Sequence, residues 1–271
     1  MSFDSRFRRF VRATVPFPVR RVVHRVRAQP FKLWDLLPDL ADLVRIVGPP
    51  PLPPPALRGR VSWTTSRKEF RRVGSQGAAD VEAAFSRARR TGEDYRRWLD
   101  FGCGCGRLSR HLATGDRARR LTGVDVDVPA VAWAAHQLRG RFFPIGETPP
   151  MALPPASFDV AVAVSVFTHL PENAQRQWRE ELHRVLRPGG LLIATTLPPR
   201  LVSMVPDLAP EQSDELDRRG FLYAPGPGPF NQNAAFHSRE FLEATWQPLF
   251  RLREFRPAGM TNFQDLSVWE A

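Results

Sequence analysis

A loop of alternating glycines is the feature of this sequence best suited to hold a small molecule. Residues 102–106 read G-C-G-C-G, after the short apolar segment 98–101 and before a helical pattern that begins at Arg107. Glycines at alternate positions let the backbone turn sharply and approach a ligand closely. The third glycine comes one residue too early for the G-x-G-x-x-G of a dinucleotide site, and no G-x-x-x-x-G-K-S/T loop is present. A pyrophosphate is therefore not the favoured ligand.

The sequence around this loop resembles one enzyme family. D-F-G-C-G-C-G-R at 100–107 closely resembles motif I of the class I S-adenosylmethionine-dependent methyltransferases. Further landmarks follow in the order typical of that family, so the resemblance covers about residues 74–197. They are L-T-G-V-D at 121–125, G-E at 146–147, L-P and S-F-D before a strand at 160–165, and H-R-V-L-R-P-G-G at 183–190.

The resemblance implies a cofactor site for S-adenosylmethionine, with S-adenosylhomocysteine as product. Asp125, which ends the second strand, is expected to accept both ribose hydroxyls, and Glu147 stands where the family more usually has an aspartate for the adenine. Asp100 is expected either to contact the cofactor's amino group or to hydrogen-bond the loop. The predicted cofactor-binding residues are Asp100, Phe101, Gly102, Cys103, Gly104, Gly106, Asp125, Val126, Glu147 and Ser165.

Two histidines are candidates for a general base. Methyl transfer is an in-line displacement at an activated carbon, and a hydroxyl nucleophile is helped by a base, for which neutral histidine is the commonest choice. His169 follows the predicted fourth strand, where ligands of open α/β sheets lie, so it is the predicted catalytic residue, with a positioning role as the alternative. His237 is the weaker candidate and, with Tyr223 and Asn231, is expected to contact the substrate.

The elements that must position these residues alternate between short apolar strands and amphipathic helices from Val61 onward, a pattern typical of a parallel α/β sheet. The family resemblance implies a Rossmann-like three-layer sandwich with a mostly parallel seven-stranded sheet closed by an antiparallel C-terminal hairpin. We predict a basic, proline-rich extension and linker at 1–60 and the methyltransferase domain at 61–271. The Pro- and Gly-rich segment 198–238 is longer than a crossover needs and is expected to cap the substrate.

Positive charge is concentrated near the N-terminus. The formal net charge is +11, and residues 1–72 hold 16 Lys and Arg against 5 Asp and Glu, whereas residues 73–271 hold 23 of each. Residues 1–27 combine apolar side chains at helical spacing with arginines on the other faces. Such an arm could contact an anionic membrane, bind nucleic acid or pack on the main domain, and nucleic acid is the least favoured of the three.

Composition and missing motifs limit the remaining choices. The spacing of Cys103 and Cys105 suits neither a disulfide framework nor a zinc site. The sequence also shows no apolar run long enough to cross a membrane and no apolar core of a signal peptide. We therefore expect a cytoplasmic protein without a metal, with peripheral contact at the inner membrane face through the arm. The favoured function is O- or N-methylation of a small-molecule or lipid- or glycan-linked acceptor. An RNA methyltransferase that uses the basic arm and a non-catalytic scaffold of the same fold are the alternatives.

Overall fold

A computed structural model describes residues 49–62, 65–205, 209–226 and 233–271. The chain divides into a unit Met1–Pro51 and a unit Leu52–Ala271, and the second contains every element discussed below. The predicted basic arm at 1–27 and Asn231 lie outside the described residues. None of the described helices has the length and apolar character needed to cross a bilayer.

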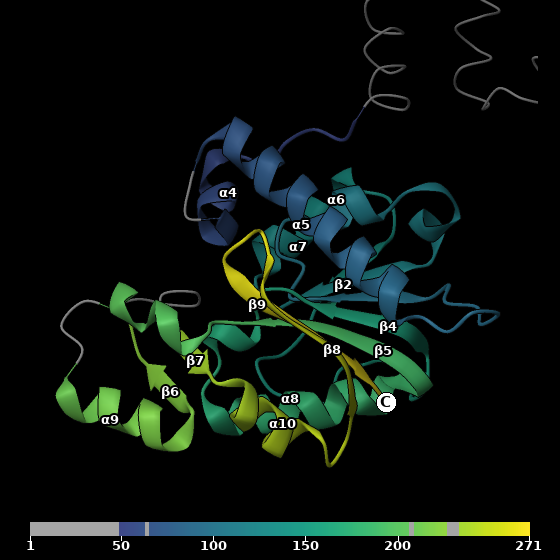
Figure 1. Ribbon diagram of the computed structural model, residues 1–271. Helices are drawn as coiled ribbons and strands as arrows, with labels where there is room; N and C mark the ends of the chain where they lie inside the picture. The colour runs from purple at the N-terminus through teal and green to yellow at the C-terminus, as the bar shows by residue number, and fades with distance from the viewer. Residues whose placement is uncertain (1–48, 63–64, 206–208, 227–232) are drawn as a thin grey trace, which may run out of the picture. The chain divides into compact units, whose positions relative to one another are not determined.

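The core of the second unit is one seven-stranded sheet (Figure 1). Strand β1 pairs in parallel with β2 and β4, and β9 runs antiparallel to both β5 and β8. Strands β1 and β4 are buried at every residue, as expected for central parallel strands covered on both faces. This arrangement confirms the predicted fold class. In spatial order the strands are β3 (Arg141–Pro144), β2 (Leu121–Asp125), β1 (Trp98–Phe101), β4 (Phe158–Ala163), β5 (Leu186–Thr196), β9 (Gln264–Glu270) and β8 (Arg251–Met260).

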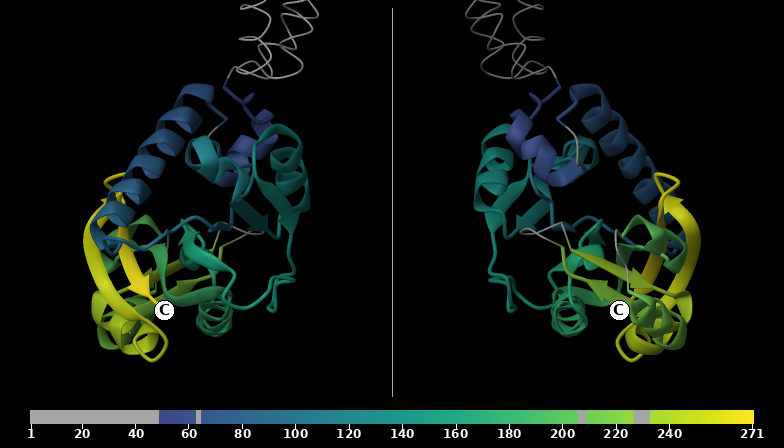
Figure 2. Two further views of the ribbon diagram at one scale, coloured as in Figure 1. Left: turned by 90° about the vertical axis from the view of Figure 1, so that its right-hand side faces the viewer. Right: turned by 90° about the vertical axis from the view of Figure 1, so that its left-hand side faces the viewer.

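Helices cover both faces of this sheet (Figure 1; Figure 2). Helices α5 (Arg67–Ala88), α6 (Ser109–Leu112) and α7 (Val128–Gln137) pack on one face against Trp98 and its neighbours, with the short helix η2 (Gly115–Arg119) between α6 and β2. Helices α8 (Glu172–Val185) and α10 (Arg239–Trp246) pack on the other face against Leu99. Successive residues of a strand point to opposite faces, so this alternation produces two apolar cores and three layers.

The segment 198–238 folds into a small substructure of its own. It contains η4 (Pro199–Met204), α9 (Pro210–Arg219) and a two-stranded antiparallel sheet of β6 (Phe221–Ala224) and β7 (Ala234–His237). Leu216, Leu222 and Phe236 form its apolar core. Phe236 also forms a parallel bridge with Leu197, directly after β5, so the substructure is attached at the carboxyl end of the main sheet.

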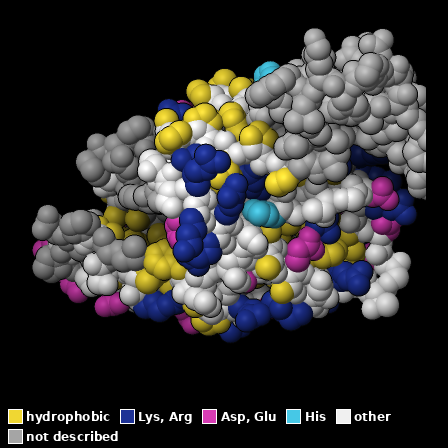
Figure 3. Space-filling model, turned by 90° about the horizontal axis from the view of Figure 1, so that it is seen from above, with side chains coloured by type: hydrophobic (Ala, Val, Ile, Leu, Met, Phe, Trp, Pro, Cys, Tyr) yellow, Lys and Arg dark blue, Asp and Glu magenta, His cyan; other side chains and the backbone are white. Residues whose placement is uncertain are grey.

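Helix α4 (Pro55–Ser62) covers the glycine loop. Its Leu57 and Val61 pack against a small buried cluster that contains Phe70 and Cys105. Residues from Leu52 onward therefore belong to the same compact unit as the sheet, although the sequence places them in the extension at 1–60. Seen from the side of α4 and α5, the surface carries Lys and Arg side chains gathered around a histidine (Figure 3).

Candidate active site

The glycine loop joins β1 to α6 and needs its glycines for two reasons. Gly102, Gly104 and Gly106 have φ values of 78°, 52° and 74°, in the left-handed region that favours glycine. A Cβ at Gly102 would lie 2.3 Å from Val166 Cγ2, and one at Gly106 would lie 2.1 Å from Leu138 Cδ1. Both the backbone conformation and the close packing therefore exclude side chains, as the alternating glycines predict.

Asp125 joins the end of β2 to this loop. Its carboxylate accepts hydrogen bonds from the backbone N–H of Gly104 at 2.7 Å and of Asp127 at 2.9 Å. Burial raises the pKa of Asp125 despite these bonds. Val126 beside it is half-buried, whereas Glu147, after β3, is exposed. The structure thus places the predicted ribose-binding carboxylate against the loop, and it leaves Glu147 in solvent.

Asp100 lies beneath the loop and is almost fully buried. It accepts a hydrogen bond from the Ser109 hydroxyl at the start of α6. Burial raises the pKa of this carboxyl to about 6. The bond to Ser109 fits the interpretation in which Asp100 fixes the loop, and the second carboxyl oxygen has no hydrogen-bond donor among the described residues.

The end of β4 bends towards the glycine loop. Ser165 has a φ of 59°, a conformation that costs about 1–3 kcal/mol for a residue with a side chain. Its N–H donates to Thr195 Oγ1 at 2.8 Å, and its side chain hydrogen-bonds Gln264, which also accepts from Thr195. This network from three strands holds the strained turn, and it places Val166 against Gly102.

His169 ends the short helix η3 (Phe167–His169) beyond β4. Its Nδ1 lies 2.7 Å from the backbone carbonyl of Asn233. A carbonyl only accepts hydrogen bonds, so Nδ1 carries the proton and Nε2 of the neutral ring is the basic nitrogen. Burial, together with the charge of Arg107, lowers the pKa of His169. At neutral pH the ring is therefore uncharged, as a general base must be.

His237 has a different environment from the one expected of a substrate-binding residue. It is 1% exposed, and its Nε2 lies 3.0 Å from Gln175 Oε1, while the Gln175 amide donates to the carbonyls of Phe167 and Leu170. Burial lowers the pKa of His237 to about 3. The structure therefore corrects the expectation for His237: it links β7 to η3 and α8 inside the protein and is not accessible to a substrate.

The other predicted residues are placed as follows. Tyr223 is half-buried on β6 of the same substructure, and Asn231 lies outside the described residues. Burial raises the pKa of the Cys105 thiol to about 12 and that of the Cys103 thiol well above its ordinary value, so both remain protonated fillers of the loop. Within the described ranges, no group of His, Cys, Asp or Glu is arranged to hold a metal ion.

The sequence interpretation included Arg107 in the motif at 100–107 but gave it no role in the site. It follows Gly106 directly, and its charge favours ionisation of Asp100 and lowers the pKa of His169. The signal in the sequence was its position directly after the last glycine of the loop, two residues before α6 begins at Ser109. Nothing in the sequence shows that this residue packs against Gly74 of α5.

The sheet order and the position of the site at the carboxyl ends of β1, β2 and β4 define a Rossmann-like methyltransferase fold. Residues 99–194 match the family described as a methyltransferase domain. A solved methyltransferase of Methanosarcina mazei, described as S-adenosylmethionine-dependent, matches 66% of this chain and 93% of its own at 19% identity, with a TM-score of 0.52. Residues 99–194 therefore belong to a methyltransferase domain, as the motifs predict.

Two curated relatives each match part of the chain. A probable S-adenosylmethionine-dependent methyltransferase of Mycolicibacterium smegmatis is 38% identical over 102 residues, which are 36% of this chain and 37% of the relative. The malonyl-[acyl-carrier protein] O-methyltransferase of Pseudescherichia vulneris is 31% identical over 106 residues, which are 36% of this chain and 38% of the relative. The matches thus span less than half the length of either relative.

Proposed function

We propose that this protein is an S-adenosylmethionine-dependent methyltransferase that methylates an oxygen or nitrogen of a small-molecule or lipid- or glycan-linked acceptor by direct in-line transfer. The observation that carries the proposal is the Asp125 carboxylate held 2.7 Å from the Gly104 N–H at the end of β2. Each carboxylate oxygen has two acceptor positions, so both oxygens retain capacity for the hydroxyls of a ribose. The name of the Pseudescherichia relative favours oxygen as the methylated atom.

The residues of the site fit this cofactor. The left-handed glycines let the loop backbone approach a ligand, Asp125 would hold the ribose, and Asp100 offers negative charge beneath the loop for an ammonium group. S-Adenosylmethionine, when bound, supplies a methyl group already activated by the sulfonium. The protein therefore needs to bind, orient and exclude water, and helix α4 covers the loop accordingly.

His169 would act on the acceptor. With Nδ1–H donated to Asn233, its Nε2 would take the proton from a hydroxyl as that oxygen forms its bond to the methyl carbon. The electron pair of the breaking S–C bond would remain on sulfur. Because Asn233 belongs to the segment between β6 and β7, this contact supports the proposal that the segment 198–238 caps the acceptor.

Calorimetric titration with S-adenosylhomocysteine tests the proposal. We expect saturable binding that Asp125→Ala weakens at least tenfold, about 1.4 kcal/mol, because charge-assisted hydrogen bonds are lost. Asp116→Ala is the matched control, since Asp116 is an exposed acid on η2 and the substitution removes the same charge. Absence of binding at millimolar ligand, or equal weakening by both variants, would contradict the proposed cofactor site.

A further inference from the structure

The surroundings of Arg107 point to a second binding function within the site. Its backbone and side chain lie against Gly74 of α5, where a Cβ would be 2.6 Å from the Arg107 carbonyl oxygen and 3.3 Å from its Cγ. Gly74 is therefore the residue that lets helix and arginine pack this closely. The side chain packs on α5 beside the glycine loop, and it is only partly exposed.

The guanidinium of Arg107 has no hydrogen-bond or ion-pair partner among the described residues. Burial lowers its pKa, which reflects the cost of removing a cation from water. Other half-buried arginines of the described chain are paired: Arg117 with Glu82, and Arg187 with Asp159 and Glu93. A guanidinium of a half-buried arginine whose five N–H donors have no protein partner is thus an exception among the described residues, and a ligand that pairs with it would be favoured.

Arg107 lies close enough to Asp100 and His169 for its charge to act on both. Asp100 lies in β1, and His169 follows β4 next to the segment 198–238. Arg107 directly follows the last glycine of the loop that leaves β1, so all three residues lie at the carboxyl end of the sheet. The unpaired donors are therefore available at the end of the sheet where an acceptor would lie.

We propose that Arg107 binds a carboxylate of the methyl acceptor, so that the acceptor is an acid whose nucleophilic hydroxyl lies within reach of His169. This inference rests on the proposed function and adds the chemical class of the acceptor. One planar guanidinium matches one carboxylate through two parallel N–H···O bonds. A phosphate would bring about −1.5 to −2 charges beside the Asp100 carboxylate, which opposes it.

The test compares acids with their uncharged amides on the protein saturated with S-adenosylhomocysteine. The probes are 4-hydroxybenzoate with 4-hydroxybenzamide and 3-hydroxydecanoate with 3-hydroxydecanamide, measured by calorimetry. We expect at least one acid to bind tenfold or more tightly than its amide. Arg107→Gln should abolish that preference, and Arg107→Lys should retain part of it, because a charge remains without the planar fork.

The controls separate this inference from the proposed function. Affinity for S-adenosylhomocysteine should change less than twofold in Arg107→Gln, and a thermal melt shows whether the variant is folded. Arg119→Gln removes the same charge from an exposed position on η2 and should leave the acid preference intact. Equal binding of acid and amide in both pairs would overturn the inference. A tenfold loss of S-adenosylhomocysteine affinity in Arg107→Gln would also overturn it, since Arg107 would then serve the cofactor.

A wild-type protein that fails to bind S-adenosylhomocysteine at all would refute the proposed function itself. That result is distinguishable from failure of the acid preference, because the two titrations are made in sequence on the same protein. Binding of the cofactor product without any preference for an acid leaves the methyltransferase proposal intact and removes only the role of Arg107.

Discussion

The two ends of the central sheet differ in whether their charged side chains are paired. At the amino end of β4, Asp159 accepts hydrogen bonds from the backbone N–H of Arg97 at 2.7 Å and from the Arg187 side chain at 3.0 Å. Arg187 also pairs with Glu93 at 2.9 Å. Burial acts to raise the pKa of Asp159, but the bonds from both arginines outweigh it and lower that pKa. The charged groups of this cluster therefore have their partners within the protein.

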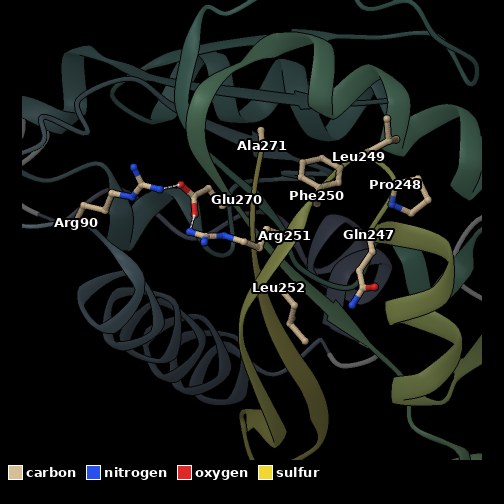
Figure 4. Close-up of a pocket in the computed structure, with 9 residues that line it drawn as sticks. All are labelled: Arg90, Gln247, Pro248, Leu249, Phe250, Arg251, Leu252, Glu270 and Ala271. Atoms are coloured by element: carbon tan, nitrogen blue, oxygen red, sulfur yellow. Dashed lines mark hydrogen bonds and ion pairs between the residues drawn. The ribbon is translucent and has the colours of Figure 1, made fainter.

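The edge of the sheet at the same end repeats this arrangement. Glu270 of β9 is paired with Arg90 and Arg251 beside a hollow of about 650 Å³ (Figure 4). Arg253 also pairs with Glu270. Burial opposes ionisation of Glu270, and its arginine partners lower its pKa nonetheless. The hollow is therefore bordered by charges that already have partners, so it offers a ligand little electrostatic gain.

At the carboxyl end, several charged groups have no ion-pair partner among the described residues. Burial raises the pKa of Asp100 and of Asp125, Arg107 lacks a partner among the described residues, and Ser165 has a left-handed backbone. Unfavourable ionisation and backbone strain concentrated in one place are typical of functional sites. The amino end of the sheet therefore stabilises the fold, whereas the carboxyl end carries ionisation and backbone costs that are typical of a binding site.

The largest expected effect comes from crowding the glycine loop. Gly102→Ala would place a Cβ 2.3 Å from Val166 Cγ2 at a φ of 78°, so we expect the free energy of unfolding to fall by about 3 kcal/mol and S-adenosylhomocysteine affinity to fall at least 100-fold. Gly92→Ala is the control, since Gly92 precedes β1 at a similar φ of 85° with nothing within 4 Å. Normal S-adenosylhomocysteine binding by Gly102→Ala would show that the close packing of Gly102 against Val166 is not needed for the site.

The second prediction uses the opposite pKa shifts at the two ends. The pKa of Asp100 is raised from 3.8 to about 6, so the folded state disfavours its charge and loses up to about 3 kcal/mol as pH rises from below 4 to above 6. Asp100→Asn should therefore stabilise the protein relative to wild type more at pH 7.5 than at pH 4, as urea unfolding can show. An effect independent of pH would mean that Asp100 is not held in this environment.

Asp159→Asn should destabilise the protein by about 2 kcal/mol at pH 7, because two arginines lose their shared carboxylate. The pKa of Asp159 is lowered, so its contribution is present above the ordinary pKa and is lost as pH falls through the lowered one. Urea unfolding measures the loss, and calorimetry should find S-adenosylhomocysteine affinity unchanged. Weakened binding would show that the two ends are not independent.

The smallest effect is expected for the ion pair between α4 and the site. Arg60 pairs with Asp127 at 2.8 Å and is half-exposed, so Arg60→Ala should cost at most about 1 kcal/mol and weaken S-adenosylhomocysteine binding only a few-fold, through looser cover of the loop. Arg87→Ala breaks the similarly exposed pair with Glu254 away from the loop. Both variants should lose similar stability, and only the first should release the ligand faster in stopped-flow displacement.

Much of the site could be predicted from the sequence because it is local. The loop 102–106 lies between a strand and a helix, and its glycines are required by its own backbone conformation. Asp100 and Asp125 end or precede such elements, so their positions follow from the order of strands in a parallel sheet.

The sequence by itself determined the fold class, the cofactor loop and the acids beside it, because strand order and glycine conformation are properties of short segments. Only the tertiary structure decided what each remaining charge contacts. It brought the Asn233 carbonyl to His169 across 64 positions, enclosed His237 against Gln175, and packed Arg107 against Gly74 of α5. Hydrogen-bond partners and burial depend on segments far apart in the chain, so the pKa, the tautomer and the availability of a side chain are fixed only when those segments meet.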